Sequence, residues 1–400
     1  MAGPSGPQPQ SAVGGPLPTA SPSTAALPFD DAVDQMTVAL FANARLGEAS
    51  GRSLVIDPLI DEASGNELVA TRSMERRMTD VVRARFPGIE PRPFTSGILA
   101  SRPLVLLGSI TPVAGPGVMP TTIAPTKTYR IWAVIADLST NRILSHESAW
   151  VRPDGVDMAP TQFFRDSPSW LADGSQAAYI KTCGSKPGEE IDPTYMKGLL
   201  AGAAISDGIR AYEAGQYGNA VTLLTSAGAA PQGDQLRVYN GLYLSNAALG
   251  RQRPAEAAFG HLVDYGIQRG KLAVKFVFRP NATQFWPDPA ISGAYPMWLR
   301  QIAARMEADA ACLRLVGHTS PTGPAALNQT LSFARADTVR SLLVGRAAGL
   351  AGKTNAEGHG STEPIVGSGR DDATDVLDRR VEFIARPCSP PNAMGRTATD

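Results

Sequence analysis

The stretch ACLRLVGHTSPTGPAALNQTLSFARADTVRSLLVG, residues 311–345, decides the fold of the C-terminal part of this chain. Residues 311–320 form an apolar run typical of a strand, and residues 328–345 carry apolar side chains at helical spacing. The flanking sequence predicts, in chain order, a strand (271–285), an amphipathic helix (296–308), a glycine-rich loop with GHGSTEPI (358–365) and an edge strand (378–387). The segment therefore has the order β-α-β-α-β.

This segment, residues 271–387, resembles the OmpA-like C-terminal peptidoglycan-binding domain. The resemblance is carried by Val-Gly-His-Thr at 316–319 and by the pattern N-x-x-L-S-x-x-R-A-x-x-V that begins at Asn328. The Gly-His-Gly-Ser-Thr-Glu-Pro-Ile loop and the Asp-Arg-Arg-Val-Glu run from Asp378 add to it. The resemblance implies a non-enzymatic protein of the cell envelope of a diderm bacterium, which is anchored to peptidoglycan or contacts it.

The resemblance assigns a ligand-binding role to Arg335. In that family a helix arginine grips the carboxylate of diaminopimelate, in the stem peptide of peptidoglycan. The planar fork of a guanidinium suits a carboxylate because paired hydrogen bonds fix the orientation of the ligand. The alternative is that Arg335 makes a salt bridge to the neighbouring loop and has a structural role only.

Two positions depart from the family pattern. The aspartate of the family's G-H-T-D motif, which receives the ammonium group of the ligand, is Ser320 here, and a second acidic position is Arg279. Loss of a charged hydrogen-bond partner costs about 1.5–3 kcal/mol, so the resemblance alone does not secure binding. Asp378 and Arg379 are expected to hold the last strand. The predicted site, completed by neutral hydrogen-bonding side chains, comprises Arg335, Asn328, Thr319, Ser320, Asn281, Thr283 and Thr322.

The N-terminal segment, residues 30–155, predicts an α/β sandwich. Its elements are a helix (30–47), a strand (53–61), a helix (67–86), a strand (103–113) and a hairpin (129–151). The segment resembles the envelope domains of the FlgO/CsgG/LpoB type. The resemblance is carried by a strand that ends in Asp-Pro, by a strand that ends in Leu-Gly-Ser-Ile and by the turn DLSTNR, in which Asn141 stands where the family has glycine. The resemblance implies a domain that docks other envelope proteins.

Two further segments lie between these domains. Residues 156–204 are rich in Pro, Gly and Asp and predict an ordered, loop-rich connector. Residues 205–270 predict two helical hairpins similar to tetratricopeptide repeats, with Ala220 and Ala257 as matching positions. A generic four-helix spacer is the alternative. The predicted fold class is thus α/β multidomain, with an N-terminal sandwich, a central helical repeat pair and a C-terminal OmpA-like domain.

Composition and the chain ends limit the function further. The chain has 37 Lys+Arg and 37 Asp+Glu, so no net charge attracts nucleic acid. No apolar run is long enough to span a bilayer. Residues 1–29 are uncharged and proline-rich and predict a disordered tether, either an ordinary terminus or the tether of an exported protein whose signal was removed. Residues 388–400 predict a tail. The expected location is the periplasm, with outer-membrane association through a removed signal or a lipid anchor as an option.

The cysteines and histidines predict neither a metal nor a cofactor. Cys312 lies in an apolar run and is expected to be a buried inert thiol, whereas Cys183 and Cys388 lie in loop-like sequence and could pair in an oxidising compartment. No two histidines have metal-ligand spacing, and they are scattered singly at His146, His261, His318 and His359.

The sequence contains no recognisable catalytic motif. The run AAGLAGKT at 347–354 resembles the end of a phosphate-binding loop, but it lacks the first glycine and does not follow a strand. We therefore expect a non-enzymatic envelope protein, with peptidoglycan and other envelope proteins as partners. The alternative is a scaffold subunit of an envelope, secretion or motility assembly whose OmpA-like domain has lost wall binding. A periplasmic hydrolase would need an unrecognised site within residues 30–200.

Overall fold

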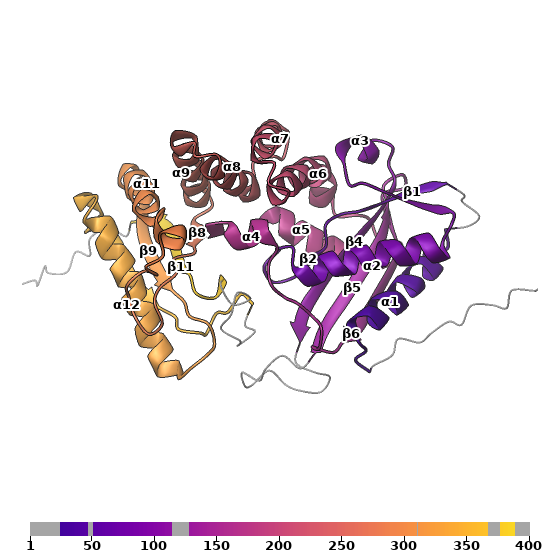
Figure 1. Ribbon diagram of the computed structural model, residues 1–400, viewed down its shortest axis with the longest axis horizontal. Helices are drawn as coiled ribbons and strands as arrows, with labels where there is room; N and C mark the ends of the chain where they lie inside the picture. The colour runs from indigo at the N-terminus through magenta and orange to yellow at the C-terminus, as the bar shows by residue number, and fades with distance from the viewer. Residues whose placement is uncertain (1–24, 47–50, 114–127, 310, 367–376, 389–400) are drawn as a thin grey trace, which may run out of the picture.

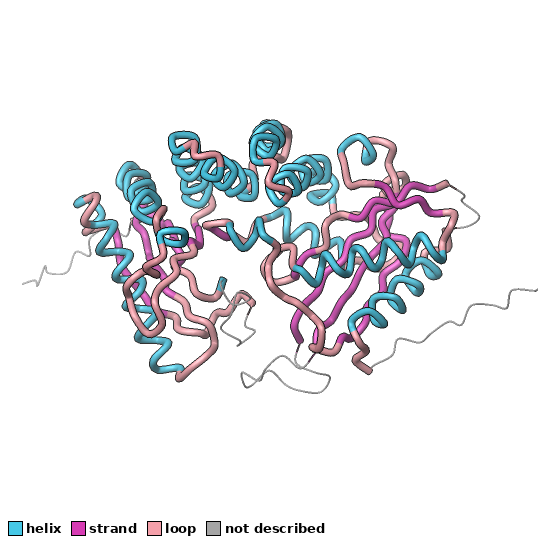
Figure 2. The backbone as a smooth tube through the Cα atoms, viewed as in Figure 1, coloured by secondary structure: helices cyan, strands magenta, loops and turns pink. Residues whose placement is uncertain are grey.

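The computed structural model describes residues 25–46, 51–113, 128–309, 311–366 and 377–388. They form a mixed α/β protein with two mixed sheets, and helices α6 to α9 extend from one sheet to the other along the upper side of Figure 1. The tube in Figure 2 shows the same layers, with helices outside both sheets. The predicted tether and tail lie almost wholly outside the described residues. Within the described residues, no helix has the length and apolar character that a bilayer crossing requires.

The N-terminal sheet has the strand order β3-β1-β4-β5-β6, and β2 pairs with β4. Strand β1 pairs in parallel with β3 and β4, whereas β4, β5 and β6 are antiparallel. Helices α1 and α2 cover one face, where Leu40, Met74 and Met78 are fully buried. The elements are α1 (Phe29–Asn43), β1 (Arg52–Ile56), β2 (Ile60–Asp61), α2 (Val69–Arg85), β3 (Ile89–Arg92), α3 (Ser96–Leu99), β4 (Leu104–Val113), β5 (Thr128–Asp137) and β6 (Arg142–Val151).

Most N-terminal elements agree with the sequence prediction, but two details differ. The strand predicted at 53–61 is divided into β1 and β2, because Asp57 precedes Pro58 and a proline restricts its neighbour and donates no backbone hydrogen bond. Strand β3 was not predicted, since IEPR has no apolar alternation. The predicted hairpin is confirmed, and Asn141 in its turn has a φ of 59°, a left-handed conformation that asparagine tolerates.

The prediction of a loop-rich connector at 156–204 was wrong. The segment contains α4 (Gln162–Asp166), β7 (Ser169–Trp170), α5 (Gly174–Cys183) and the start of α6 (Pro193–Glu213). Asp173 caps α5 by accepting a hydrogen bond from the backbone of Gln176, and Asp192 caps α6 directly before its first-turn proline. The helix-stabilising effect of these caps exceeds the tendency of the many Pro, Gly and Asp residues to form loops, which was the basis of the prediction. Strand β7 joins the C-terminal sheet by pairing with β8.

The central helices form two hairpins, α6–α7 (Tyr217–Ala229) and α8 (Leu236–Ala248)–α9 (Gln252–Gln268). Each hairpin turns at a glycine with positive φ, Gly215 at 71° and Gly250 at 68°, so the structural repeat is 35 residues. This register matches the buried Ala220 with the buried Ala255. The sequence match of Ala220 to Ala257 was therefore wrong, and Ala257 is exposed.

The C-terminal sheet has the order β10-β9-β11-β8-β7. Strand β9 pairs in parallel with β10 and antiparallel with β11, which in turn pairs antiparallel with β8. The helices of this domain share one core with the central hairpins: Trp298 stacks on Phe259 at 5.3 Å between ring centroids and donates to the hydroxyl of Tyr243. The elements are β8 (Lys271–Val274), α10 (Pro289–Ser292), α11 (Tyr295–Ala308), β9 (Ala311–Gly317), α12 (Ala325–Val344), η1 (Ala348–Leu350), β10 (Thr354–Gly358) and β11 (Val381–Pro387).

The predicted β-α-β-α-β order needs two corrections. Strand β10 was missed, so the observed order is β-α-β-α-β-β. The strand predicted at 271–285 ends at Val274, and residues 277–286 fold into a loop in which Phe278 and Phe285 form an isolated β-bridge. We call residues 277–286 the aromatic loop. Its phenylalanines pack against the core, which explains why the run is apolar without being a strand.

The cysteine pairing also differs from the prediction. Cys312, expected to be an inert thiol, forms a disulfide with Cys388. Cys183 is fully buried in α5 and unpaired, so the suggested Cys183–Cys388 bridge was wrong. The register of β9 against β11 explains the observed pair, because it places Ala311 opposite Pro387 and so brings the neighbouring cysteines together.

Candidate functional site

Helix α12 organises the predicted site through buried polar residues of the motif. Asn328 donates to the carbonyl oxygen of Thr322 at 2.9 Å and faces that of Ser320 at 3.4 Å. Ser332, four residues on, accepts a hydrogen bond from the backbone of Gly360 and donates to the carbonyl of Gln329. The motif asparagine and serine thus fix the loops that follow β9 and β10 onto the helix.

The predicted hydroxyl residues gather at the end of β9. The hydroxyls of Ser320 and Thr322 lie 3.1 Å apart, and the backbone of Thr319 donates to Gly360 at 2.8 Å. Thr319 and Ser320 are buried, and the hydroxyl of Thr319 has no hydrogen-bond partner among the described residues. The end of β9 therefore carries a cluster of hydroxyl groups beside Asn328.

Arg335 contacts the aromatic loop. Its Nε donates to the carbonyl of Ala282 and its Nη2 to that of Arg279, both at 3.1 Å. The guanidinium also lies over the ring of Phe278, 5.0 Å from the centroid. Arg335 is only 8% exposed. These contacts fix the orientation of the guanidinium, so any ligand role of Arg335 comes in addition to a structural one.

Asn281 and Thr283 flank the carbonyl that Arg335 contacts, at the tip of the aromatic loop. Asn281 is exposed and has a φ of 51°, and Thr283 is partly buried. The structure thus places the seven predicted residues in two groups along one side of α12. Ser320, Thr322, Thr319 and Asn328 lie near its start, and Arg335 lies with the loop that carries Asn281 and Thr283. Asp378, expected to hold the last strand, accepts hydrogen bonds from the backbone of Ile365 and Val366.

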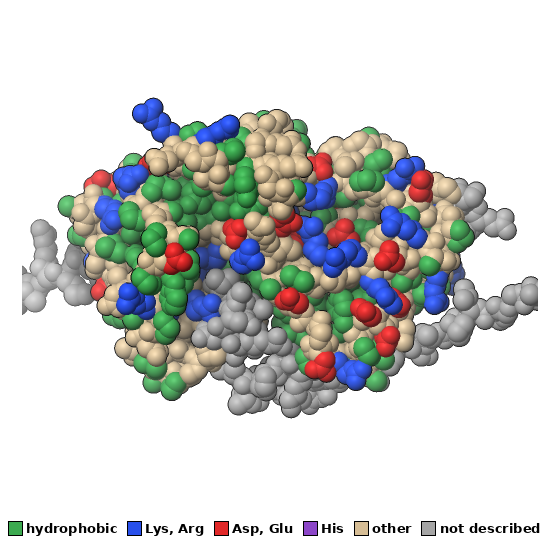
Figure 3. All heavy atoms as spheres, viewed as in Figure 1, with side chains coloured by type: hydrophobic (Ala, Val, Ile, Leu, Met, Phe, Trp, Pro, Cys, Tyr) green, Lys and Arg blue, Asp and Glu red, His purple; other side chains and the backbone are tan. Residues whose placement is uncertain are grey.

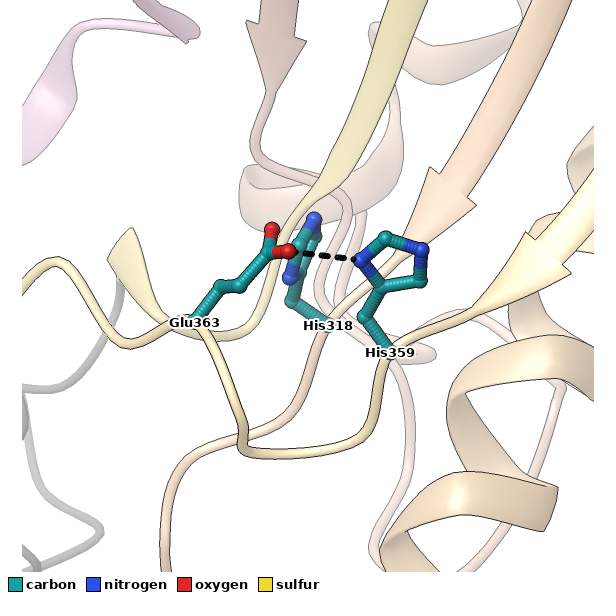
Figure 4. A group of neighbouring side chains, drawn as sticks. All are labelled: His318, His359 and Glu363. Carbon is teal, nitrogen blue, oxygen red and sulfur yellow. Dashed lines mark hydrogen bonds and ion pairs between the residues drawn. The ribbon is translucent and has the colours of Figure 1, made fainter.

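The structure brings together three residues that the sequence did not connect. His318 follows β9, His359 follows β10, and Glu363 lies on the loop after β10 (Figure 4). One potential ligand atom of each lies within 4.8 Å of the other two. The prediction of singly scattered histidines therefore fails for this pair. The sequence does contain a Gly-His pair at the end of each strand, at 317–318 and at 358–359. These pairs indicate that the histidines are neighbours only once the register of β9 against β10 is known.

A second polar feature is a cavity of about 110 Å³. It is lined by residues of β2 and its adjoining loops, of α4, α5, α6 and α8, and by Lys275. Burial raises the pKa of Asp57 to about 7, although the hydroxyl of Tyr195 donates to it at 2.6 Å. The ammonium of Lys275 donates to the carbonyls of Phe164 and Arg165, and burial lowers its pKa to about 7. The cavity wall thus has an acid and a base that both titrate near neutrality.

Lys275→Met is expected to remove a pH dependence of stability. The pKa of Lys275 falls from 10.5 to about 7 on folding, so between these values the unfolded chain binds a proton that the folded chain does not. The free energy of unfolding of the wild type should therefore rise with pH in this window, by up to about 1.4 kcal/mol per pH unit relative to the variant. Urea unfolding of both proteins from about pH 7 to about pH 9 measures the difference. Parallel profiles would contradict it.

No family model and no curated protein matches this chain. Solved structures similar to part of it include the periplasmic domain of MotB from Helicobacter pylori, at 16% identity and a TM-score of 0.25, covering 30% of this chain and 76% of that one. The peptidoglycan-associated lipoprotein from Burkholderia pseudomallei has 23% identity, a TM-score of 0.24 and coverage of 28% and 89%. The cell wall anchor of the T6SS from Pseudomonas aeruginosa has 26% identity, a TM-score of 0.24 and coverage of 29% and 81%. The similar part is less than a third of this chain.

Proposed function

We propose that this chain is a non-enzymatic cell-envelope protein whose C-terminal domain holds the diaminopimelate end of a peptidoglycan stem peptide at Arg335. The observation that carries the proposal is the placement of Arg335. Two backbone carbonyls and the ring of Phe278 fix its guanidinium at the tip region of the aromatic loop. A guanidinium whose orientation is fixed loses less entropy when it binds a carboxylate. The motif residues Asn328 and Ser332 hold the adjacent loops onto the same helix.

The hydroxyl cluster takes the place of the missing carboxylate in this proposal. Ser320, Thr322 and Thr319 offer neutral acceptors to the ammonium group of diaminopimelate. Neutral hydrogen bonds are roughly half as strong as charge-assisted ones, so wall binding should be weaker than in domains that keep the aspartate. The disulfide Cys312–Cys388 agrees with an exported protein, because disulfides persist in oxidising compartments. A location in the periplasm is therefore part of the proposal.

The N-terminal domain and the helical hairpins would dock other envelope proteins. Leu200 on α6 is 53% exposed and Leu249 after α8 is 38% exposed, so both offer apolar contacts.

In Figure 3, charged side chains of both signs are interspersed over the N-terminal half, and hydrophobic side chains gather over the C-terminal half. Large exposed hydrophobic side chains of the C-terminal domain include Trp286, Ile291, Leu327 and Phe333.

The second candidate function is a scaffold whose OmpA-like domain no longer binds the wall. Two observations favour it. Ser320 is a buried hydroxyl beside Thr322 where the family has a carboxylate, and Arg335 uses donors on carbonyls of its own chain. A scaffold would keep these residues for packing alone.

Arg335→Ala is expected to weaken co-sedimentation with purified diaminopimelate-type sacculi by about tenfold or more, the cost of a charged hydrogen bond. Arg335→Lys should weaken it as well, because lysine keeps the charge but lacks the planar fork. Arg346→Ala is the matched control, since Arg346 is exposed just beyond the same helix. Circular dichroism verifies that each variant is folded.

The outcome separates the two candidates. If the wild type and Arg335→Ala pellet equally poorly, wall binding is wrong and the scaffold remains. If the wild type pellets and the Arg335 variants do not, the wall-binding proposal holds. Co-purification of envelope proteins with an Arg335 variant that no longer pellets would show docking that is independent of the wall.

A further inference from the structure

The parallel register of β9 and β10 places two histidines side by side. Gly317 pairs with Gly358, so the next residues, His318 and His359, leave the two strands at the same level. Their ring centroids lie 5.5 Å apart, with the rings nearly perpendicular. The loop after β10 then turns back, so that Oε1 of Glu363 lies 3.0 Å from Nδ1 of His359 (Figure 4). Strand pairing and a short loop thus bring together three side chains that can bind a metal.

His318 gives a second, independent indication of a ligand. Its side chain is only 1% exposed, and neither ring nitrogen has a hydrogen-bond partner among the described residues, although Oε2 of Glu382 lies 3.7 Å from Nε2. Buried polar atoms are almost always hydrogen-bonded, because an unpaired one costs about 1–3 kcal/mol. A bound cation would give one of these buried nitrogens the partner that it lacks.

We propose that His318, His359 and Glu363 form a binding site for a divalent transition-metal ion of the Zn²⁺ class. Two imidazole nitrogens and one carboxylate oxygen form the protein ligand set of open zinc sites, in which water takes the fourth position. This proposal does not depend on the proposal that the C-terminal domain binds the wall.

The geometry requires only local adjustment. Bonds of about 2.0–2.2 Å in a tetrahedron place ligand atoms about 3.3 Å apart, so the three atoms must approach each other by at most about 1.5 Å. The side chains of His359 and Glu363 are 29% and 55% exposed, which leaves them room to rotate. His318 is the fixed ligand, and the two exposed side chains adjust to it.

Neighbouring charges support the buried ligand. Oε2 of Glu382 lies 3.7 Å from Nε2 of His318, so a small movement would let this carboxylate accept a hydrogen bond from Nε2 and orient the ring for metal binding through Nδ1. The positive charges of Arg380 and Lys271 are both paired with Glu382, each at 2.8 Å. Glu357 lies 3.7 Å from Nε2 of His359 and could support that ligand in the same way.

Titration of the untagged full-length chain with ZnCl₂ after removal of metal by a chelator tests the proposal. We expect one ion per chain in the wild type. His359→Ala and Glu363→Gln should each raise the dissociation constant at least tenfold, since even loss of a residue behind a ligand costs about 10–100-fold. Both side chains are partly exposed, so neither change disrupts the core. His261→Ala, which removes an exposed histidine from α9, should bind as the wild type does.

Co²⁺ provides a spectroscopic readout of the same site, because tetrahedral Co²⁺ absorbs visible light strongly. The wild type should show this absorption and the His359 and Glu363 variants should lose it. Absence of stoichiometric Zn²⁺ binding in the wild type would overturn the proposal. Unchanged affinity in both His359→Ala and Glu363→Gln would also overturn it, because the ion would then bind elsewhere.

Discussion

Replacement of Gly317 by alanine is expected to destabilise the C-terminal sheet by about 3 kcal/mol. Helix α12 crosses β9 so closely here that an added Cβ would lie 2.0 Å from the carbonyl oxygen of Ser332 and 3.3 Å from the Cβ of Ala336. The first of these atoms belongs to the helix backbone, so the clash can be relieved only by moving α12 away from the sheet. The glycine of the Val-Gly-His-Thr motif is thus required by packing.

Hydrogen exchange of peptides that cover 311–317 and 381–387 measures this effect locally, which matters because a chain with several domains need not unfold in one step. Gly352→Ala is the control, since an added Cβ at Gly352 would have no heavy atom of the described residues within 4 Å. We expect the control to change stability by less than about 0.5 kcal/mol. Equal protection in Gly317→Ala and Gly352→Ala would disprove the packing argument.

Loss of the disulfide is expected to cost about 4 kcal/mol. Cys312 and Cys388 are 76 residues apart in sequence, and closing a loop of this size removes considerable entropy from the unfolded chain. The bridge also joins β9 to the end of β11, next to their pairing at Ala311 and Pro387. Its removal should therefore free the end of the last strand as well.

Urea unfolding with and without reductant measures this cost. The wild type should lose stability on reduction, Cys388→Ser should have low stability under both conditions, and Cys183→Ala should respond to reductant as the wild type does. If a thiol assay shows complete reduction of the wild type and the unfolding midpoint does not move, the predicted contribution is wrong.

The sequence predicted the helices and strands whose apolar residues recur at regular spacing. It missed the strands that form only because a neighbouring strand pairs with them. The helices α1, α2, α7, α8, α9, α11 and α12 and the strands β4, β5, β6, β9 and β11 have clear apolar patterns, and the structure confirms them. Strands β3 and β10, with the sequences IEPR and TNAEG, have no such pattern and are strands because a neighbouring strand pairs with them. The two-residue strand β7 is too short to have any pattern of its own.

The candidate sites show the same limit. The motif around Arg335 could be located by its spacing within one helix, whereas the contacts of Arg335 with the aromatic loop could not. His318 and His359 are distant in sequence, and only the pairing of β9 with β10 makes them neighbours. The suggested pairing of Cys388 with Cys183 was wrong for a related reason, since the loop-like sequence around Cys388 gives no sign that β11 returns to the start of β9.

Strand β7 has a mechanical consequence. Residues 169–170 pair with residues 273–274, and the backbone of Lys275 donates to the carbonyl of Pro168. Tension between the N-terminal and C-terminal domains would therefore pass in part across the β7–β8 hydrogen bonds. Helices α5 to α9 lie in the segment that these bonds bypass, and they share the load through their packing against both sheets until the bonds and this packing break. The segment between β7 and β8 can then extend, which increases the distance between the two domains while the chain stays intact.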